Sequence, residues 1–492
     1  MEWEGLESGV AKQRDLPVCL GEAGRSQSLH SSDEAGNDRG AKGGRKVKSQ
    51  GKDHLPQGPA TVAAKPKQAG NQRLSKASQG IWTRSMLETL ERGIKGGRWY
   101  SLIDKVYEPE HLKLGALEVI RNKGAAGVDH RTVEQLRKEL DREVAIVARQ
   151  LREGRFEASP VKRVWIEKLG STELRPLGIP TVRDRMVQAT IRGVIEPIFE
   201  REFAEHSYGF RIGRSAQMAI QRVEELLEQG YSWVVDADLK GYFDSIPQDR
   251  LMEAVRSRIA DGRLLGLIEA YLRQGVMESG KGWTPTETGT PQGAVLSPLL
   301  ANLYLNPLDH RMAQEGYRMT RYADDFIIQC HSREAAEEAL AEVREWVEKA
   351  GLVLHPTKTR IVNATVAGGF DFLGWHFERG LKWPRKKSMD RFQETIRKET
   401  LRTNGKCLAC IHTRLNRRFR GWINYFGGGV RNVYEELDGW IRGRLRSILR
   451  KRDKRKGRGR GRDHNRYTNA YFEERGLISL SALDRVKRTS PA

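Results

Sequence analysis

The stretch Arg321-Tyr322-Ala323-Asp324-Asp325-Phe326-Ile327-Ile328 places two adjacent carboxylates between apolar, β-forming residues. Together with its flanks, over 317–329, it predicts a β-hairpin with the acids at its tip. Adjacent carboxylates repel each other, and burying them is costly unless a cation neutralises them. Side chains alternate along a strand, so only a tight turn lets both acids approach one point. The pattern indicates a site for a divalent metal with oxygen ligands, foremost Mg²⁺, although a solvent-exposed acidic turn has the same sequence.

A second acidic block lies upstream, where the β-forming run 231–238 ends in Asp238. One carboxylate at a strand end and two in a hairpin give the three acidic side chains of a two-metal site. We expect two Mg²⁺ ions there, for which Mn²⁺ can substitute. The expected catalytic and metal-binding residues are Asp238, Asp324 and Asp325, with the main-chain carbonyl of Leu239 or Ala237 as a further ligand.

Apolar periodicity along the rest of the chain predicts an α+β protein that ends in helices. Strands are expected at 161–166, just before 178, at 353–354, at 359–363 and at 370–377, and the first two form a hairpin candidate. Helices are expected at 114–123, 131–153, 182–203, 248–258, 262–273, from 297 to at least 306, at 334–350 and from 388 to about 452.

Basic residues are concentrated at the C-terminal end of the chain. The 492 residues include 86 Lys and Arg against 64 Asp and Glu, a net charge of +22. Residues 401–492 alone contain 24 basic and 8 acidic residues, whereas 101–400 is balanced. The length suggests two to four domains, and a basic flank on a balanced body is typical of nucleic-acid binding. A generic basic surface or a membrane-binding patch is the alternative explanation.

Several classes of protein are excluded by composition. No run of about 18 apolar residues occurs, so no membrane span and no membrane partner are predicted. The N-terminus lacks the apolar core of a secretory signal. Four cysteines in 492 residues form no disulfide framework, and the pair Cys407-Leu-Ala-Cys410 lacks the second pair of a zinc site, so no zinc is expected. The few cysteines fit a reducing cytosol, so we expect a cytoplasmic protein.

The two acidic blocks resemble the palm of a reverse transcriptase, in which a Tyr-Ala-Asp-Asp box follows an upstream Asp. Further blocks occur in the order that this family requires, namely Arg175-Pro-Leu-Gly-Ile-Pro180, Asp184-Arg-Met-Val-Gln188, Ser207-Tyr-Gly-Phe-Arg-Ile-Gly-Arg-Ser215, Thr290-Pro-Gln-Gly-Ala-Val-Leu-Ser-Pro298, Gly351-Leu-Val-Leu-His-Pro-Thr-Lys-Thr359 and Phe370-Asp-Phe-Leu-Gly-Trp375. Over about 82–475 the chain is similar to the reverse transcriptases encoded by group II introns. Arg420-Gly-Trp-Ile-Asn-Tyr-Phe426 and Leu437-Asp-Gly-Trp440 resemble their maturase domain, domain X, which also serves as thumb.

This resemblance implies a right-hand polymerase, with fingers and palm built from an antiparallel sheet with helices, followed by an α-helical thumb or domain X. The expected parts are a disordered basic tail at 1–80, an N-terminal extension and fingers at 81–230, a palm with the catalytic Asp residues at 231–385, a thumb at 386–450 and a basic nucleic-acid-binding tail at 451–492. Nothing resembles the HNH endonuclease domain that many such proteins carry, so target-strand nicking is not expected. A bacterial, nucleoid-associated protein is a further implication of the resemblance.

The resemblance also implies roles for single residues. For binding the nucleotide these are Lys168 and Arg175 on the triphosphate, Phe243 as a steric gate against a 2′-hydroxyl, Gln292, and Lys358 as a proton donor to pyrophosphate. Contacts to template or primer are implied for Arg211, Arg214, Tyr322, Ala323, Arg417 and Arg420. Simple packing for Phe243 and a solvated surface charge for Lys168 and Lys358 are the competing explanations. Asp236 and Asp244 are expected to be structural, and the aromatic residues at 411–450 to form core.

The implied function is that of an RNA-directed DNA polymerase of group II intron type. It would add dNTPs to a primer 3′-hydroxyl, and would bind intron RNA to assist splicing and mobility. Its partners would be intron or other template RNA, a DNA primer or target, and dNTPs, with a homodimer left open. Two alternatives remain: a domesticated group II-like reverse transcriptase acting in DNA repair or defence, and a splicing maturase that binds RNA without polymerase activity.

Overall fold

The computed structural model describes residues 76–489 except 95, 168–173, 279 and 460. The described residues belong to one compact unit, Ala69–Ala492. The expected tail at 1–80 lies almost entirely outside them, and so does Lys168, one of the expected nucleotide-binding residues.

A long buried helix, α7 (Val182–Glu200), organises the N-terminal part. It begins at Thr181, whose side chain accepts a hydrogen bond from the Asp184 amide, and almost every side chain along it is buried. Around it lie α1 (Lys76–Ile81), α2 (Arg84–Arg92), α3 (Ile103–Tyr107), α4 (Pro109–Asn122), α5 (Val133–Lys138) and α6 (Leu140–Arg152). The closest partner is α4, because a Cβ on Gly115 would lie 2.7 Å from the Met186 carbonyl oxygen.

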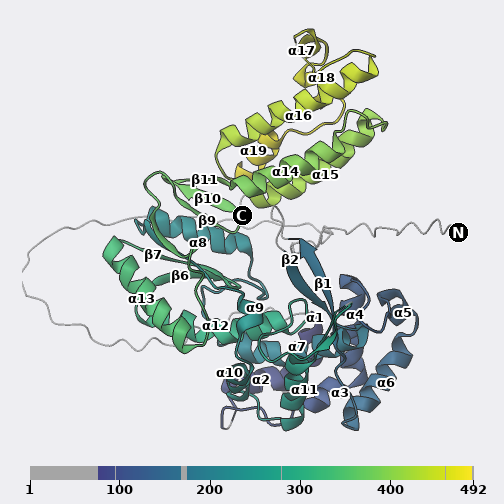
Figure 1. The fold of residues 1–492 in the computed structure, drawn as a ribbon, viewed down its shortest axis with the longest axis vertical. Coiled ribbons are helices and arrows are strands. Elements are labelled where there is room, and N and C mark those ends of the chain that lie inside the picture. The colour runs from purple at the N-terminus through teal and green to yellow at the C-terminus, as the bar shows by residue number, and fades with distance from the viewer. Residues whose placement is uncertain (1–75, 95, 168–173, 279, 460, 490–492) are drawn as a thin grey trace, which may run out of the picture. The chain divides into compact units, whose positions relative to one another are not determined.

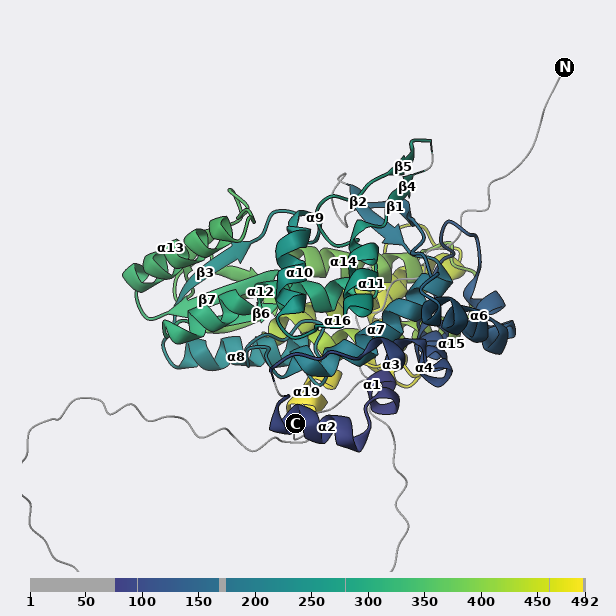
Figure 2. The same cartoon turned by 90° about the horizontal axis from the view of Figure 1, so that it is seen from below.

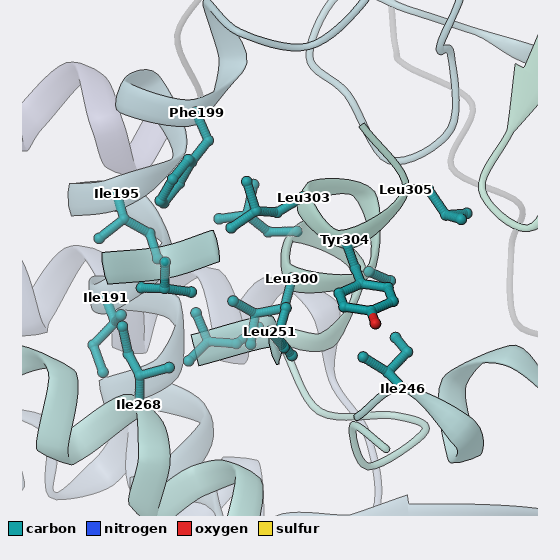
Figure 3. Packing of buried hydrophobic residues seen from close by; sticks show 14 of the residues in the cluster. Ile191, Ile195, Phe199, Ile246, Leu251, Ile268, Leu300, Leu303, Tyr304 and Leu305 are labelled. Atoms are coloured by element: carbon teal, nitrogen blue, oxygen red, sulfur yellow. The ribbon is translucent and has the colours of Figure 1, made fainter. Parts of the chain in front are cut away.

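The main hydrophobic core joins α7 to helices that come much later in the chain. Figure 3 shows Ile191, Ile195 and Phe199 of α7 packed with Leu300 and Leu303 of α12 (Ser297–Gln314). The same core takes in α10 (Gln248–Arg256) and α11 (Gly262–Arg273). Burying such side chains contributes about 1.5–3 kcal/mol each. Of the two larger sheets, the one that carries the acidic blocks adds Val235 and Phe326 to this core.

The first of these sheets has the strand order β2-β1-β4-β5. β1 (Val161–Glu167) and β2 (Leu174–Ile179) form the expected antiparallel hairpin. β4 (Val276–Glu278) runs parallel to β1 and pairs with β5 (Gly282–Thr284). The four strands lie together in Figure 2. β1 and β2 fall within the segment expected for the fingers, 81–230, whereas β4 and β5 fall within the segment expected for the palm, 231–385.

The central sheet has the order β6-β7-β3-β8, all antiparallel, and carries both acidic blocks. Its strands are β3 (Trp233–Asp238), β6 (Arg318–Tyr322), β7 (Asp325–Cys330) and β8 (Arg360–Asn363). Val235 and Ile328 pack towards α13 (Arg333–Lys349), whereas Val234 and Ile327 pack towards α8 (Ala216–Glu228). The strands expected at 231–238 and 317–329 thus belong to one sheet that has helices on both faces (Figure 1).

A small third sheet and a helical region follow. Strands β9 (Phe370–Phe372), β10 (Trp375–Glu378) and β11 (Leu381–Pro384) form an antiparallel meander. Beyond it come the helices α14 (Lys386–Glu399), α15 (Leu408–Phe426), α16 (Arg431–Arg452), α17 (Arg462–Arg466), α18 (Asn469–Glu473) and α19 (Leu480–Thr489). These helices share a separate apolar core.

The segment 451–492, expected as a separate basic tail, packs into this helical core within its described residues. Tyr467, Phe472 and Leu480 are buried beside α15 and α16. Asp438 of α16 accepts hydrogen bonds from the Leu480 and Ser481 amides, at 2.8 and 3.0 Å, and so caps the start of α19. The high density of basic residues hides this, because only a few apolar side chains are spread among them.

No helix in the described part of the chain is both long enough and apolar enough to cross a membrane.

We predict that Phe472→Ala destabilises the C-terminal helices by about 3–5 kcal/mol, the usual cost of emptying a buried aromatic site. Amides in 462–489 should then exchange with deuterium at least about 100-fold faster. The control is Val486→Ala, since Val486 in the same region is 62% exposed. Unchanged exchange in Phe472→Ala would show that this segment is not held by the core.

Candidate functional site

Strand register brings the two acidic blocks to one point. In the β3–β7 ladder Asp238 is paired directly with Asp325, and Tyr322 of β6 is paired with Asp325 from the other side. Because side chains alternate, Asp236, Asp238 and Asp325 lie on the same face of the sheet. Asp324 occupies the two-residue turn between β6 and β7. The residues expected to form a carboxylate cluster are therefore neighbours at one end of the central sheet.

The turn that carries Asp324 has an uncommon backbone. Ala323 has φ +61°, in the left-handed region that costs a residue with a Cβ about 1–2 kcal/mol. The 206–209 segment runs beside it, with the Tyr208 amide donating to the Arg321 carbonyl at 2.8 Å. A Cβ on Gly209 would lie 2.2 Å from the Ala323 nitrogen, so glycine is required there. The backbone at Gly209 therefore packs directly against the turn that carries Asp324.

Arg321 holds this turn from beneath, a role that the sequence did not reveal. Its guanidinium is fully buried, pairs with both carboxylate oxygens of Asp309 on α12, and donates to the Asn302 side chain at 2.9 Å. The same nitrogen donates to the Ala323 carbonyl at 2.8 Å. Asn302 in turn donates to the Gly209 carbonyl at 2.7 Å. One network therefore fixes both the turn and the segment beside it.

The carboxylates raise one another's pKa. Burial, followed by repulsion from Asp236, Asp324 and Asp238, raises the pKa of Asp325 to about 7. Burial and the neighbouring Asp238 also raise the pKa of Asp324, although Arg175 and Arg321 oppose this. Asp236, also raised in pKa by burial, accepts a hydrogen bond from Arg360 at 3.2 Å. Such a cluster is short of positive charge.

Lys358 supplies part of the missing charge. Its ammonium group lies 2.7 Å from Oδ2 of Asp238, although the two residues are 120 positions apart in sequence. Among the described residues, no group of three or more His, Cys, Asp or Glu side chains is arranged to hold a metal ion. The expected ligands therefore share an end of the sheet without forming a closed site, and one of them is engaged by a lysine.

The other expected nucleotide-binding residues lie on three segments beside the acids. Arg175 is exposed on β2 and near enough to lower the pKa of Asp324. Phe243 is half-buried in the short helix α9 (Tyr242–Ser245), which follows β3. Gln292 donates to Asp244 at 3.3 Å, and its carbonyl accepts from the Gly178 amide at 2.7 Å. Gln292 thus links the β1–β2 hairpin to α9, in the segment that precedes α12.

Comparisons with known proteins identify the family. The family model described as "Reverse transcriptase (RNA-dependent DNA polymerase)" matches residues 166–377, and the one described as "Group II intron, maturase-specific domain" matches residues 389–468. Protein YkfC of Escherichia coli (strain K12) is 33% identical over 312 residues, which cover 56% of this chain and 81% of YkfC. The chain belongs to the family of group II intron-type reverse transcriptases and maturases.

Two further similarities cover smaller shares of the proteins compared. Group II intron-encoded protein LtrA of Lactococcus lactis subsp. cremoris is 35% identical over 208 residues, 42% of this chain and 34% of LtrA, so the chain spans about a third of that relative. Among solved structures, "Partial Cas6-RT-Cas1--Cas2 complex" matches with 26% identity and a TM-score of 0.34, covering 50% of this chain and 42% of that one. The expected fold class, α+β fingers and palm followed by a helical domain, is confirmed.

Within this family fold, the arginines expected to contact template or primer differ in accessibility. Arg211 is buried and donates to Glu200 and to the carbonyls of Ala204 and Ser207, a structural geometry that does not favour the expected template contact. Arg214 is half-buried over the Tyr208 ring.

The two thumb arginines expected to contact nucleic acid lie on the exposed face of α15. Arg417 and Arg420 are exposed, whereas Leu415 and Phe419 of the same helix are buried in the helical core. Within the described part of the chain, neither Arg417 nor Arg420 forms an ion pair with an acidic side chain. Both guanidinium groups are therefore accessible to a phosphate backbone.

Cys407 and Cys410 form the cysteine pair at which no zinc is expected. Both are exposed free thiols at the start of α15, and the Cys407 sulfur accepts a hydrogen bond from the Cys410 amide at 3.2 Å. Cys407 therefore serves as the N-cap of the helix.

We predict that Arg321→Met strongly destabilises the palm, by about 3–5 kcal/mol, since it leaves the buried Asp309 without a partner. Arg321→Met with Asp309→Leu should restore the melting temperature, because apolar replacement of a buried pair is often neutral. Amides of 322–325 should nevertheless exchange faster than in the wild type, as the Ala323 carbonyl has lost its donor.

The matched control is Arg311→Met with Glu342→Leu. This pair joins α12 to α13 and each side chain is about a third exposed, so we expect changes below about 1 kcal/mol and normal exchange at 322–325. Slow exchange at 322–325 in the Arg321 double variant would refute the role of Arg321 in fixing the turn.

Proposed function

We propose that this protein is an RNA-directed DNA polymerase that adds dNTPs to the 3′-hydroxyl of a primer paired with an RNA template. The observation that carries the proposal is the direct pairing of Asp238 with Asp325, with Asp324 in the adjoining turn. Three carboxylates at one end of a palm sheet, held by a rigid turn, are what in-line transfer of a nucleotidyl group requires. Membership of the reverse transcriptase family supports the proposal.

Divalent metal ions such as Mg²⁺, which this family generally uses, fit the donors present. Asp238, Asp324 and Asp325 offer hard oxygen ligands, with the Leu239 carbonyl as a further one. The raised pKa values of Asp324 and Asp325 support this, because they mark a shortage of positive charge. When bound, such ions activate the primer hydroxyl and neutralise the leaving pyrophosphate.

The residues around the acids would bind the nucleotide, select its sugar and protonate the leaving pyrophosphate. Arg175 would bind the triphosphate, with Lys168 as its predicted partner, and Gln292 would help to position the nucleotide. Phe243 would lie under the sugar and exclude a 2′-hydroxyl. Lys358 would leave Asp238 when metal and nucleotide enter, and would then donate a proton to the pyrophosphate.

Binding of intron RNA, and assistance to its splicing, is the second part of the proposed function. The match of residues 389–468 to the maturase-specific domain supports it. Arg417 and Arg420 are exposed on α15 and offer positive charge, whereas Arg414 and Arg418 of the same helix pair with Glu399. Positive charge of this kind dominates affinity for a phosphate backbone. The template or intron RNA, the DNA primer and dNTPs are the proposed partners.

Primer extension tests the polymerase proposal. With Mg²⁺ and oligo(dT) on poly(rA), we expect the wild type to extend the primer, and Asp324→Ala and Asp238→Ala to lose about 10²–10³-fold or more in rate, the scale of losing one electrostatic stabiliser. Asp249→Ala is the matched control, because that carboxylate is 91% exposed on α10. Absence of extension by the wild type would refute the polymerase proposal and favour a maturase that only binds RNA.

Sugar selection tests the role of Phe243. We expect Phe243→Ala to raise incorporation of ribonucleotides relative to deoxyribonucleotides by about 10–200-fold, the range for opening space for one small group. Tyr242→Phe is the control, because it keeps an adjacent ring and removes only the hydroxyl that donates to the Ala301 carbonyl at 2.6 Å. Unchanged selectivity in Phe243→Ala would make this residue part of the packing alone.

A further inference from the structure

The turn between β9 and β10 is strained and lies beside the catalytic end of the palm. Leu373 has φ +48° and Gly374 has φ +86°. A left-handed leucine costs about 1–2 kcal/mol, so other contacts must hold it in place. Leu373 belongs to the same apolar cluster as Tyr322, the residue that adjoins Asp325 in the β6–β7 ladder. The contacts that hold the Leu373–Gly374 turn therefore also shape the surface beside Tyr322 and Asp325.

The contacts that hold this turn come from the thumb side of the chain. The Tyr425 hydroxyl, near the end of α15, donates to the Leu373 carbonyl at 2.8 Å. The Arg385 amide and the Ser388 hydroxyl both donate to the Gly374 carbonyl at 3.0 Å. The Phe426 ring covers Gly374, with ring carbons 3.4 and 3.6 Å from where a Cβ would lie. Each carbonyl of the turn thus accepts a hydrogen bond from the thumb side.

Tyr425 and its neighbour Phe426 differ from Phe419, although the aromatic residues at 411–450 were all expected to form the core of the helical region. Phe419 is buried in that core, whereas Tyr425 packs on the palm cluster with Tyr322 and Leu373. Burial, followed by the nearby Tyr322 and Asp325, raises the pKa of Tyr425 to about 12, so the phenol keeps its proton and remains a donor. One side chain of α15 therefore contacts the turn and lies close to the catalytic pair.

We propose that Tyr425 is a positioning residue, which holds the Leu373–Gly374 turn against Tyr322 and thereby fixes the place of the primer 3′ end. This inference rests on the proposed polymerase function. Binding of template and primer along α15 would then be linked to the catalytic carboxylates through one phenol. The hydroxyl is the part that matters, because the ring alone can pack on Leu373 but cannot hold its carbonyl.

The test compares Tyr425→Phe with Tyr434→Phe in the full chain. Tyr434 is a matched control, since its buried hydroxyl also bonds to backbone, donating to the Phe426 carbonyl at 2.5 Å and accepting from the Gly429 amide at 2.9 Å. Both of those partners lie outside the Leu373–Gly374 turn. Each variant is bound to a template–primer duplex with 2-aminopurine at the primer 3′ end, and its fluorescence, its duplex affinity and the burst of single-nucleotide addition are measured.

For Tyr425→Phe we expect duplex affinity within twofold of the wild type, brighter 2-aminopurine from a less ordered primer end, and a burst amplitude about three- to tenfold lower, the scale of one lost hydrogen bond. Tyr434→Phe should match the wild type in fluorescence and burst. Wild-type values for Tyr425→Phe, or equal losses in both variants, would overturn the role of Tyr425. If the wild type adds no nucleotide, the polymerase proposal fails, while the fluorescence difference still decides whether Tyr425 positions the primer end.

Discussion

The buried ion pair between Arg321 and Asp309 is the interaction on which the palm depends. An ionised guanidinium taken out of water costs several kcal/mol unless its hydrogen-bonding groups are satisfied, and here Asp309, Asn302 and the Ala323 carbonyl satisfy them. The Ala323 carbonyl belongs to the left-handed turn that also contains Asp324. The ion pair therefore ties this turn to α12. The strained backbone at Ala323 is therefore stable without any ligand.

Rigidity at the turn makes it possible to hold carboxylates that repel one another. Asp238 and Asp325 face each other across a ladder, an arrangement that disfavours folding when both are charged. Three cationic side chains lie around these carboxylates. Lys358 pairs with Asp238 and Arg360 pairs with Asp236, while Arg385 is close enough to oppose the rise in the pKa of Asp325. Lys358 is 61% exposed on its side chain, so releasing it costs little desolvation. The site is thus prepared for incoming cations and substrate phosphates.

The sequence predicted the parts of this site that depend on local pattern. The hairpin at 317–329, the strand ending at Asp238 and the hairpin beginning at Val161 follow from β-forming runs and turn residues, and the structure confirms them. The family order of motifs then implied which acids meet. The roles of Arg321 and Tyr425 were not predictable, because a buried arginine and a palm-contacting tyrosine look like a surface charge and a core aromatic until their distant partners are known. The burial of Arg211 against Glu200 was not predictable for the same reason.

The C-terminal excess of basic residues has two physical roles that composition alone does not separate. Arg446 is 5% exposed and donates to the Tyr467 carbonyl and the Asn469 side chain, while Arg450 and Arg455 both pair with the fully buried Asp463. These arginines replace the apolar contacts that a basic sequence cannot supply, and they fold 451–489 onto α16. Arg446 is buried, and the charges of Arg450 and Arg455 are partly neutralised by Asp463, so these arginines contribute less to binding a polyanion than Arg417 and Arg420. The positive charge available to a polyanion is therefore smaller than the net charge suggests, and part of it lies on α15, the helix that also carries Tyr425.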